Sequence, residues 1–247
     1  MKINILGSAG WMPSYCRETA CIMVRKNNTL LLLDAGTGVS NLKHFEKDLE
    51  KHDTIHIILS HYHLDHTIGL SYLSKWCKNK SIVLYLPKET KSGQSPREIL
   101  EQLFNSDSFA HSLYGISKDI SFFEYEEKTR FDIGDFIVET KLQTHTSPSF
   151  AIKVDDLICY ASDTIIEPTT FKWASDVKIV FHECWSKEKN SSGHSSFEEI
   201  LEESKKLKNG KVVLIHQNPD ITLEQYEGFC EGLSKIIVAK DLMEINI

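Results

Sequence analysis

A dense group of metal-ligand side chains follows one mostly apolar run in the first third of the chain. The segment Ser60-His61-Tyr62-His63-Leu64-Asp65-His66 comes directly after residues 55–59 and places four potential ligands in six positions. Imidazoles and a carboxylate packed this densely behind a buried strand would be costly without a partner, which argues against a set of surface histidines. A loop leaving a strand can turn His61 and His63 to one side and Asp65 and His66 to another. The segment therefore predicts a site for two neighbouring metal ions.

Three more polar residues end apolar strands further along the chain. His145 stands in Gln143-Thr144-His145-Thr146, Asp163 in Ala161-Ser162-Asp163-Thr164, and His216 in Ile215-His216-Gln217. Each has a plain alternative explanation when taken alone, because single histidines and aspartates are common where strands turn. Together they are candidates to complete the site.

The elements that must position these residues are strands mixed with helices in both halves of the chain. Apolar runs with strand character cover residues 2–6, 20–24, 30–33, 54–59, 81–86, 121–125, 136–142, 150–154, 157–160, 177–181, 212–215 and 242–247. Helical periodicity covers residues 39–49, 67–77, 96–104, 197–207 and 223–237. This order predicts an α/β (α+β) protein with sheets packed face to face and helices outside. No linker divides the chain, so we expect a single domain over 1–247. The polar segment 88–117 is expected to be an insertion over one face, and a role as a lid stays open.

Composition sets broad limits on partners and location. The chain has 247 residues and a formal net charge of −7, which argues weakly against broad nucleic-acid binding. No apolar run approaches the ~20 residues that span a bilayer, so no membrane partner and a cytoplasmic location are expected. The six cysteines form no C-x-x-C pair, which fits reduced thiols.

The segment from His61 to His66 matches the H-x-H-x-D-H signature of the metallo-β-lactamase superfamily. The opening Gly7-Ser8-Ala9-Gly10 with Pro13, and the turn Asp34-Ala35-Gly36-Thr37-Gly38, further resemble its branch of ribonuclease Z and small phosphodiesterases. The resemblance runs over nearly the whole chain. It implies a four-layer αββα sandwich of two mixed β-sheets with helices outside, in one hydrolase domain.

The resemblance also implies a set of metal ligands. His61, His63 and His145 would hold one divalent ion, Asp65, His66 and His216 the other, and Asp163 would bridge them. These ligands suit Zn²⁺, with Mn²⁺ or Fe left open. Two such ions lower the pKa of a shared water from about 15.7 toward ~7, which supplies a hydroxide nucleophile.

Two further residues are given a catalytic role, besides Asp65, by the same resemblance. Glu183 follows the apolar run 177–181, and His194 precedes the helix expected from residue 197. In the ribonuclease Z branch a glutamate here orients a histidine that donates a proton to the leaving oxygen, a contribution of about 10²- to 10⁴-fold. The alternatives are a helix-capping His194 and a merely buried, paired Glu183.

The substrate follows from what the chain lacks as much as from what it has. Ribonuclease Z carries an arm for transfer RNA between the segments that match His145 and Asp163, and here these residues are only 18 apart. A phosphodiesterase for a small or cyclic nucleotide, or for an RNA end, is therefore expected. The alternatives are a ribonuclease Z-type tRNA 3′-end endonuclease, a lactone, thioester or β-lactam hydrolase, and a metal-binding protein without turnover. A homodimer stays open.

Overall fold

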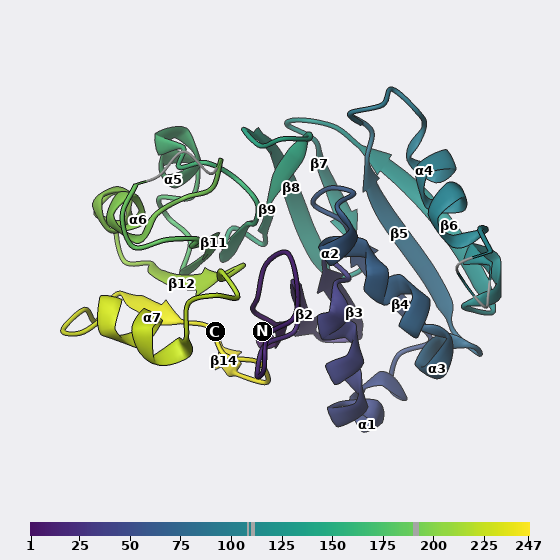
Figure 1. Cartoon of the computed structure of the whole chain (residues 1–247). Coiled ribbons are helices and arrows are strands. Elements are labelled where there is room, and N and C mark those ends of the chain that lie inside the picture. Colours follow the sequence, from purple (N-terminus) through teal and green to yellow (C-terminus); the bar gives the residue numbers. More distant parts are fainter. Residues whose placement is uncertain (108, 110–111, 190–192) are drawn as a thin grey trace.

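The computed structural model of the chain describes residues 1–107, 109, 112–189 and 193–247, drawn as a ribbon in Figure 1. Within these residues two seven-stranded β-sheets account for most of the regular structure. No helix among them is long and apolar enough to cross a membrane.

The first sheet is built from the N-terminal half of the chain and one strand from its end. In spatial order it contains β14 (Glu244–Asn246), β1 (Lys2–Gly7), β2 (Cys21–Lys26), β3 (Thr29–Leu33), β4 (Thr54–Ile58), β5 (Ser81–Pro87) and β6 (Asp119–Tyr125). The pairs from β14 to β3 are antiparallel, and those from β3 to β6 are parallel.

The second sheet has the same mixed character. In spatial order it contains β13 (Ile236–Val238), β12 (Lys211–Ile215), β11 (Ile179–Glu183), β10 (Ile158–Ala161), β9 (Ser149–Val154), β8 (Phe136–Gln143) and β7 (Arg130–Ile133). The pairs from β10 to β13 are parallel, whereas β7 to β10 form an antiparallel meander. Strands β8, β10, β11 and β12 therefore run in one direction and end at the same edge.

Helices cover the outer face of each sheet. Over the first sheet lie α1 (Glu46–Leu49), α3 (Ser74–Cys77), α4 (Pro96–Phe104) and the 3₁₀ helices η1 (Thr37–His44), η2 (Ile68–Tyr72) and η3 (Leu113–Gly115); over the second lie α5 (Pro168–Trp173), α6 (Phe197–Ser204) and α7 (Leu223–Phe229) (Figure 1). A short helix, α2 (Leu64–Thr67), follows β4. The predicted αββα sandwich is confirmed.

The alternation of side chains explains the continuous apolar runs. In β3, Leu31 and Leu33 join the core between the sheets, while Leu30 and Leu32 pack under the outer helices, and all four are fully buried. A strand covered on both faces needs no polar alternation. The core between the sheets contains residues from both halves of the chain, which agrees with a single domain. The single domain over 1–247 stays a prediction.

The helix boundaries differ most from the expectation. The predicted helix over 67–77 is instead divided into α2, η2 and α3, and within η2 the Gly69 nitrogen donates to the Ala35 carbonyl at 2.8 Å, outside the helix. Gly69 lies so close to the turn after β3 that a β-carbon would stand 2.0 Å from the Gly36 carbonyl oxygen. The predicted helix over 223–237 ends at Phe229, and Gly232 follows in the left-handed region at φ +76°. The chain then forms β13, which the sequence analysis missed together with β7 and α5.

The described residues of the segment 88–117 pack onto the first sheet as part of its outer layer. Helix α4 begins at Pro96, and Ser95 before it is the N-cap of a complete capping box. Leu100, Phe104 and Leu113 are at most 1% exposed in the cluster under this layer. None of the segment's described residues lines the cavity that contains the predicted site.

Candidate metal centre and active site

The predicted ligands converge on one buried carboxylate, Asp163, which follows β10. Its Oδ2 atom lies 3.3 Å from His61 Nε2, 3.2 Å from His145 Nε2 and 3.7 Å from His63 Nδ1. His61 and His63 come from the loop after β4, and His145 comes from the loop after β8. The two sheets therefore contribute jointly to this half of the site.

The other oxygen of Asp163 faces the second group. Asp163 Oδ1 lies 2.6 Å from His216 Nε2 and 3.4 Å from His66 Nε2. Asp65 Oδ2 closes the group at 3.2 Å from His216 Nε2 and 3.4 Å from His66 Nε2. One carboxylate thus presents a separate oxygen to each of the two sets of three residues expected from the sequence.

The spacing of these atoms fits metal ions. Four ligands at Zn–N or Zn–O bonds of about 2.0–2.1 Å in a tetrahedron stand roughly 3.3–3.4 Å apart, close to most of the separations found here. His61 Nε2 and His66 Nε2 are buried without a hydrogen-bond partner, and His63 Nδ1 faces His145 Nε2 at 3.3 Å. Unpartnered ring nitrogens aimed at one another are what a bound divalent cation would satisfy.

Asp34, which follows β3, supports the ligands from behind. Its fully buried carboxylate accepts hydrogen bonds from His66 Nδ1 (2.7 Å), Tyr160 Oη (2.7 Å), Ser60 Oγ (2.7 Å) and the Ser60 backbone nitrogen (2.6 Å). The sequence analysis quoted Asp34 within a family motif but gave it no role. The signal available was an aspartate directly after a fully apolar strand.

These contacts determine which ring nitrogen of each histidine is free. His66 Nδ1 donates to Asp34, and His61 Nδ1 donates to the Ser60 hydroxyl oxygen at 2.9 Å, while that hydroxyl donates to Asp34. The proton on Nδ1 leaves Nε2 as a lone-pair donor in both rings. Burial lowers the pKa of His61 to about 4, which keeps His61 neutral as a ligand must be.

The loop between β1 and β2 contacts two of the candidate ligands, Asp65 and His216. The Trp11 backbone nitrogen donates to Asp65 Oδ2 at 2.7 Å, and Gly10 lies against the His216 ring. A β-carbon on Gly10 would stand 2.4 Å from that ring, so only glycine fits beside His216 as it is placed. His216 itself has a positive φ of +44°.

Glu183 and His194 form a hydrogen-bonded pair beside the ligand cluster. His194 Nδ1 lies 2.8 Å from Glu183 Oε2, and Glu183 is fully buried at the end of β11. The other carboxylate oxygen of Glu183 accepts a hydrogen bond from the Thr164 backbone nitrogen. The His194 ring stacks on Trp185 with ring centroids 4.6 Å apart. A ring nitrogen of His194 lies within 4.8 Å of ligand atoms of Asp163 and His216.

The electrostatics of this pair favour a charged imidazole. Burial lowers the pKa of His194, but the hydrogen bond and charge of Glu183 outweigh burial and raise the pKa above its ordinary value. The helix-capping alternative for His194 does not hold, because Ser196 is the N-cap of α6 and forms a capping box with Glu199.

These groups line a cavity of about 290 Å³. Its walls are formed by residues of the ligand cluster, the pair and the loops around them: Trp11, His63, Asp65, His145, Thr146, Asp163, Trp185, His194 and His216. Two tryptophans thus frame the opening beside the predicted metal ligands.

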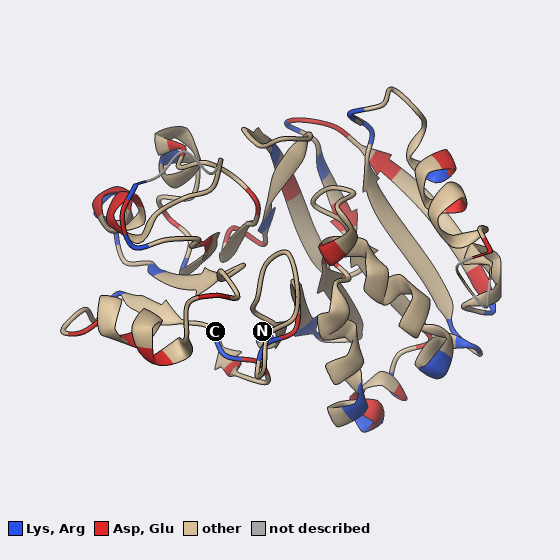
Figure 2. Cartoon of the chain, viewed as in Figure 1, with Lys and Arg blue, Asp and Glu red and all other residues tan. Residues whose placement is uncertain are grey.

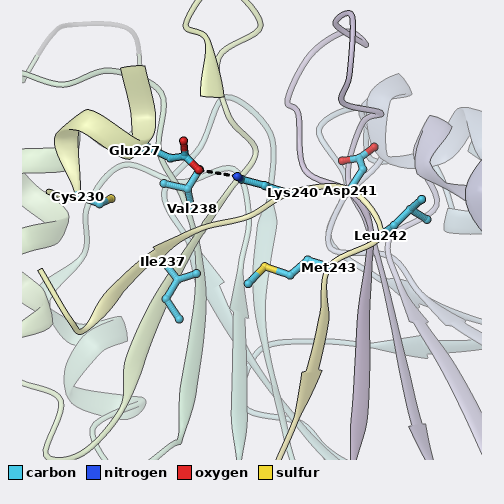
Figure 3. A pocket seen from close by; sticks show the side chains of 8 residues that line it. All are labelled: Glu227, Cys230, Ile237, Val238, Lys240, Asp241, Leu242 and Met243. Atoms are coloured by element: carbon cyan, nitrogen blue, oxygen red, sulfur yellow. Dashed lines mark ion pairs between the residues drawn. The ribbon is translucent and has the colours of Figure 1, made fainter. Parts of the chain in front are cut away.

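A larger groove of about 590 Å³ near the C-terminus has a different character (Figure 3). Its side chains include the ion pair of Glu227 with Lys240 and the apolar Ile237 and Met243. Asp241 at its edge is engaged with the β1–β2 loop, where it accepts hydrogen bonds from Ser8 and from the Glu18 backbone nitrogen. Burial raises the pKa of Asp241 to about 6. Asp241 thus ties the edge of the groove to that loop, and among the residues that the structure describes no cluster of metal-ligand side chains lies in the groove.

The other histidines that the structure describes lie on the surface or in structural positions, as the sequence predicts. His182 is buried against Phe171 on the outer side of β11, with Cys184 in the core nearby, so neither reaches the site. His52 and His56 make structural hydrogen bonds to Asn28 and Tyr85, and His44 is exposed. His111 lies outside the described residues.

Comparison with known protein families shows to which family the chain belongs. A family model described as "Anti-Pycsar protein Apyc1" matches residues 1–235. The chain belongs to the Anti-Pycsar protein Apyc1 family. The chain's curated relatives and structural neighbours place it in the metallo-β-lactamase superfamily, in the ribonuclease Z and PhnP-like branch, which confirms the predicted branch.

Individual relatives of this Apyc1-family chain are distant. A ribonuclease Z of Nanoarchaeum equitans is 31% identical over 153 residues, which cover 60% of this chain and 44% of that protein. The chain thus spans less than half the length of the first curated relatives that it matches. The metallo-β-lactamase fold protein YhfI of Bacillus subtilis superposes with a TM-score of 0.80 at 18% identity, over 99% of this chain and 98% of that one. A diphosphatase of the PhnP family superposes with a TM-score of 0.77 at 15% identity, over 100% and 97%.

These relationships confirm the expected class. The chain falls in the ribonuclease Z and PhnP-like branch and has a His/Asp cluster suited to divalent metal. The substrate, the number and identity of the ions and the roles of single residues belong to the proposal that follows.

Proposed function

We propose that this protein is a phosphodiesterase that uses two divalent ions to hydrolyse a small or cyclic nucleotide. His61, His63, His145 and Asp163 would hold one ion, and Asp65, His66, His216 and Asp163 the other. The ligands are imidazoles and carboxylates without thiolate, a set that favours Zn²⁺ and also accepts Mn²⁺ or Fe. When bound, a pair of such ions ionises water at neutral pH and stabilises developing negative charge.

The observation that carries the proposal is the Glu183–His194 pair beside the ligand cluster. An alkoxide leaving from phosphorus is a poor leaving group and needs a proton donor. The 2.8 Å bond from His194 Nδ1 to a buried carboxylate orients the ring and keeps it protonated, so that His194 can supply that proton. Expulsion of a thiolate, or opening of a strained amide, has less need of such an acid. This difference favours phosphodiesters over thioesters and β-lactams.

The size of the substrate is limited by the site and by the loop where ribonuclease Z has its arm. Residues 149–161 here form only the β9–β10 hairpin, with Asp155 and Asp156 at positive φ in its tight turn. No lysine or arginine stands among the described residues that line the cavity. In Figure 2 the positions of acidic and basic residues are interspersed along the ribbon of the visible elements. A polyanion would require a continuous basic track, whereas one phosphodiester group needs only the ions and His194.

Processing of transfer RNA is a second candidate, because curated relatives such as that of Nanoarchaeum equitans carry the name ribonuclease Z. The two candidates differ in the length of nucleic acid that must be bound. A precursor transfer RNA cleaved more efficiently than any mononucleotide would select the second.

The test is turnover by purified, metal-loaded protein on cyclic mononucleotides, an aryl phosphodiester, short RNA, a precursor transfer RNA, a lactone and a thioester. We expect hydrolysis of cyclic nucleotides. His194→Ala is expected to keep both metals and to lose at least about 10²-fold in kcat on diesters with alkoxide leaving groups.

Loss of a metal from His194→Ala would instead make His194 a ligand, since it lies within ligand reach of Asp163 and His216. Equal activity of wild type and variant on an alkyl diester would remove the reason for choosing phosphorus.

A further inference from the structure

The side chain of Trp11 is exposed at the mouth of the site in a conformation that folding alone does not favour. Trp11 is 65% exposed and has a φ of +63°. A bulky residue in the left-handed region is strained, and a large apolar side chain in water gains nothing from burial. Strain maintained beside a candidate active site points to a use for the side chain.

The backbone that carries Trp11 is held firmly. The Gly10 nitrogen donates to the Gln217 carbonyl at 2.9 Å, and the Trp11 nitrogen donates to Asp65 Oδ2. Deeper in the loop, the buried Arg17 guanidinium bonds to Gln217 Oε1 at 2.8 Å and to the Ile221 carbonyl at 2.8 Å. The indole is therefore presented from a fixed backbone position directly beside a predicted metal ligand.

We propose that Trp11 is the stacking platform for the base of the nucleotide substrate, and so determines specificity for a nucleobase-bearing diester. The inference rests on the proposed function. Within the cavity, the phosphate is accounted for by the predicted ions and His194, and Trp185 is engaged in stacking on His194. The face of Trp11 is the large apolar surface that remains at the opening. Indole faces bind bases of any sequence because every base offers a π-face.

Tyr15 provides a matched control on the same loop. The Tyr15 side chain is fully exposed to solvent, and it does not line the cavity. Loss of Tyr15 removes an exposed aromatic ring from the loop without touching the site. A general effect of loop aromatics, including contact with a second copy of the chain, would show in both Trp11→Ala and Tyr15→Ala.

The experiment compares wild type, Trp11→Ala, Trp11→Phe and Tyr15→Ala with two substrates. One is a 3′,5′-cyclic nucleotide, and the other is 1-O-methylribose 3′,5′-cyclic phosphate, which lacks the base. Stacking of one base predicts that Trp11→Ala raises KM for the nucleotide by between about 5- and 150-fold, with kcat near that of wild type. Trp11→Phe recovers much of the loss. Tyr15→Ala behaves as wild type, and KM for the base-free substrate is the same in all four proteins.

A binding measurement separates this inference from the proposed function. A phosphorothioate cyclic nucleotide, titrated into each metal-loaded protein, is expected to quench tryptophan fluorescence in wild type and far less in Trp11→Ala. If no diester is hydrolysed but quenching depends on Trp11, the proposed function fails and the base platform stands.

If wild type hydrolyses nucleotides and Trp11→Ala does so with unchanged KM, the platform is wrong and the proposed function stands. Equal losses on both substrates, or equal losses in Trp11→Ala and Tyr15→Ala with a change of molecular mass in light scattering, would also overturn it. Equal losses in the two variants together with the change of mass would assign the loop to a subunit interface instead.

Discussion

Replacement of Asp34 by asparagine tests whether support from behind the ligands sets the metal affinity of the site. Asp34 has a φ of +59°, a region that asparagine adopts readily, so Asp34→Asn preserves the backbone better than alanine would. The amide retains one oxygen and turns the other into a donor. It can keep that oxygen toward His66 and Tyr160 only by directing its NH₂ group at the Ser60 nitrogen, which then loses its acceptor.

Two effects follow from this geometry. A buried N–H left without an acceptor costs about 1–3 kcal/mol of folding stability. The loss of negative charge behind the His66 ring makes it a weaker ligand, and loss of such a partner typically costs 10- to 100-fold in metal affinity, or about 1.4–2.7 kcal/mol. The ion near His66, Asp65 and His216 should weaken more than its neighbour.

Chelator competition followed by metal analysis measures both affinities, and Tyr160→Phe is the matched control. That variant removes one hydrogen bond to Asp34 but keeps the charge, so its affinity loss should be smaller. Thermal unfolding of the metal-free proteins separates stability from affinity. Two ions bound by Asp34→Asn as tightly as by wild type would refute the reasoning, as would a larger effect of Tyr160→Phe.

Three further predictions concern the acid, the loop and a buried histidine. Glu183→Gln should lower kcat by about 10²-fold for an alkoxide leaving group and much less for p-nitrophenolate, because only the former needs a proton from His194; an equal loss on both substrates in steady-state kinetics would contradict this. Gly10→Ala should displace His216, since the new β-carbon meets its ring at 2.4 Å, and metal analysis should find one ion lost; full occupancy would show that the loop yields. Burial lowers the pKa of His182, so below a pH of about 6.5 the unfolded chain binds a proton at this residue that the folded chain does not bind. The free energy of unfolding therefore falls as the pH drops, by at most about 1.4 kcal/mol per pH unit. The variant His182→Asn lacks this contribution. In urea unfolding of the metal-free proteins, the difference in unfolding free energy between wild type and variant should therefore become smaller from about pH 7.5 to about pH 5.5. A difference that does not change with pH would contradict this prediction.

Most of the strands could be predicted from the sequence, and the grouping of the candidate site residues could be proposed from it, because these signals are local or belong to a motif. Leu30 to Leu33 form a continuous apolar run that only a doubly covered strand explains. The four candidate ligands between His61 and His66 occupy six consecutive positions after β4, so their proximity needs no long-range information. His145, Asp163 and His216 each end a strand, and parallel strands bring such ends together.

What the sequence did not predict depends on contacts between distant segments. The Gly69 nitrogen bonds to the distant Ala35 carbonyl and not within its helix, and Asp34 gains its role only when Ser60, His66 and Tyr160 surround it. Strand β13 lies at the edge of the second sheet, where its pairing with β12 overrides a helical pattern. The pattern of apolar residues along the chain does not show which distant segments will be in contact.

The measurement that tests the central claim most directly is a crystal structure of the protein loaded with Zn²⁺ or Mn²⁺, with anomalous scattering to locate the ions. The account predicts two ions, each coordinated by a different oxygen of Asp163, with His61, His63 and His145 on one and Asp65, His66 and His216 on the other. A single ion, or ions held away from Asp163, would contradict it.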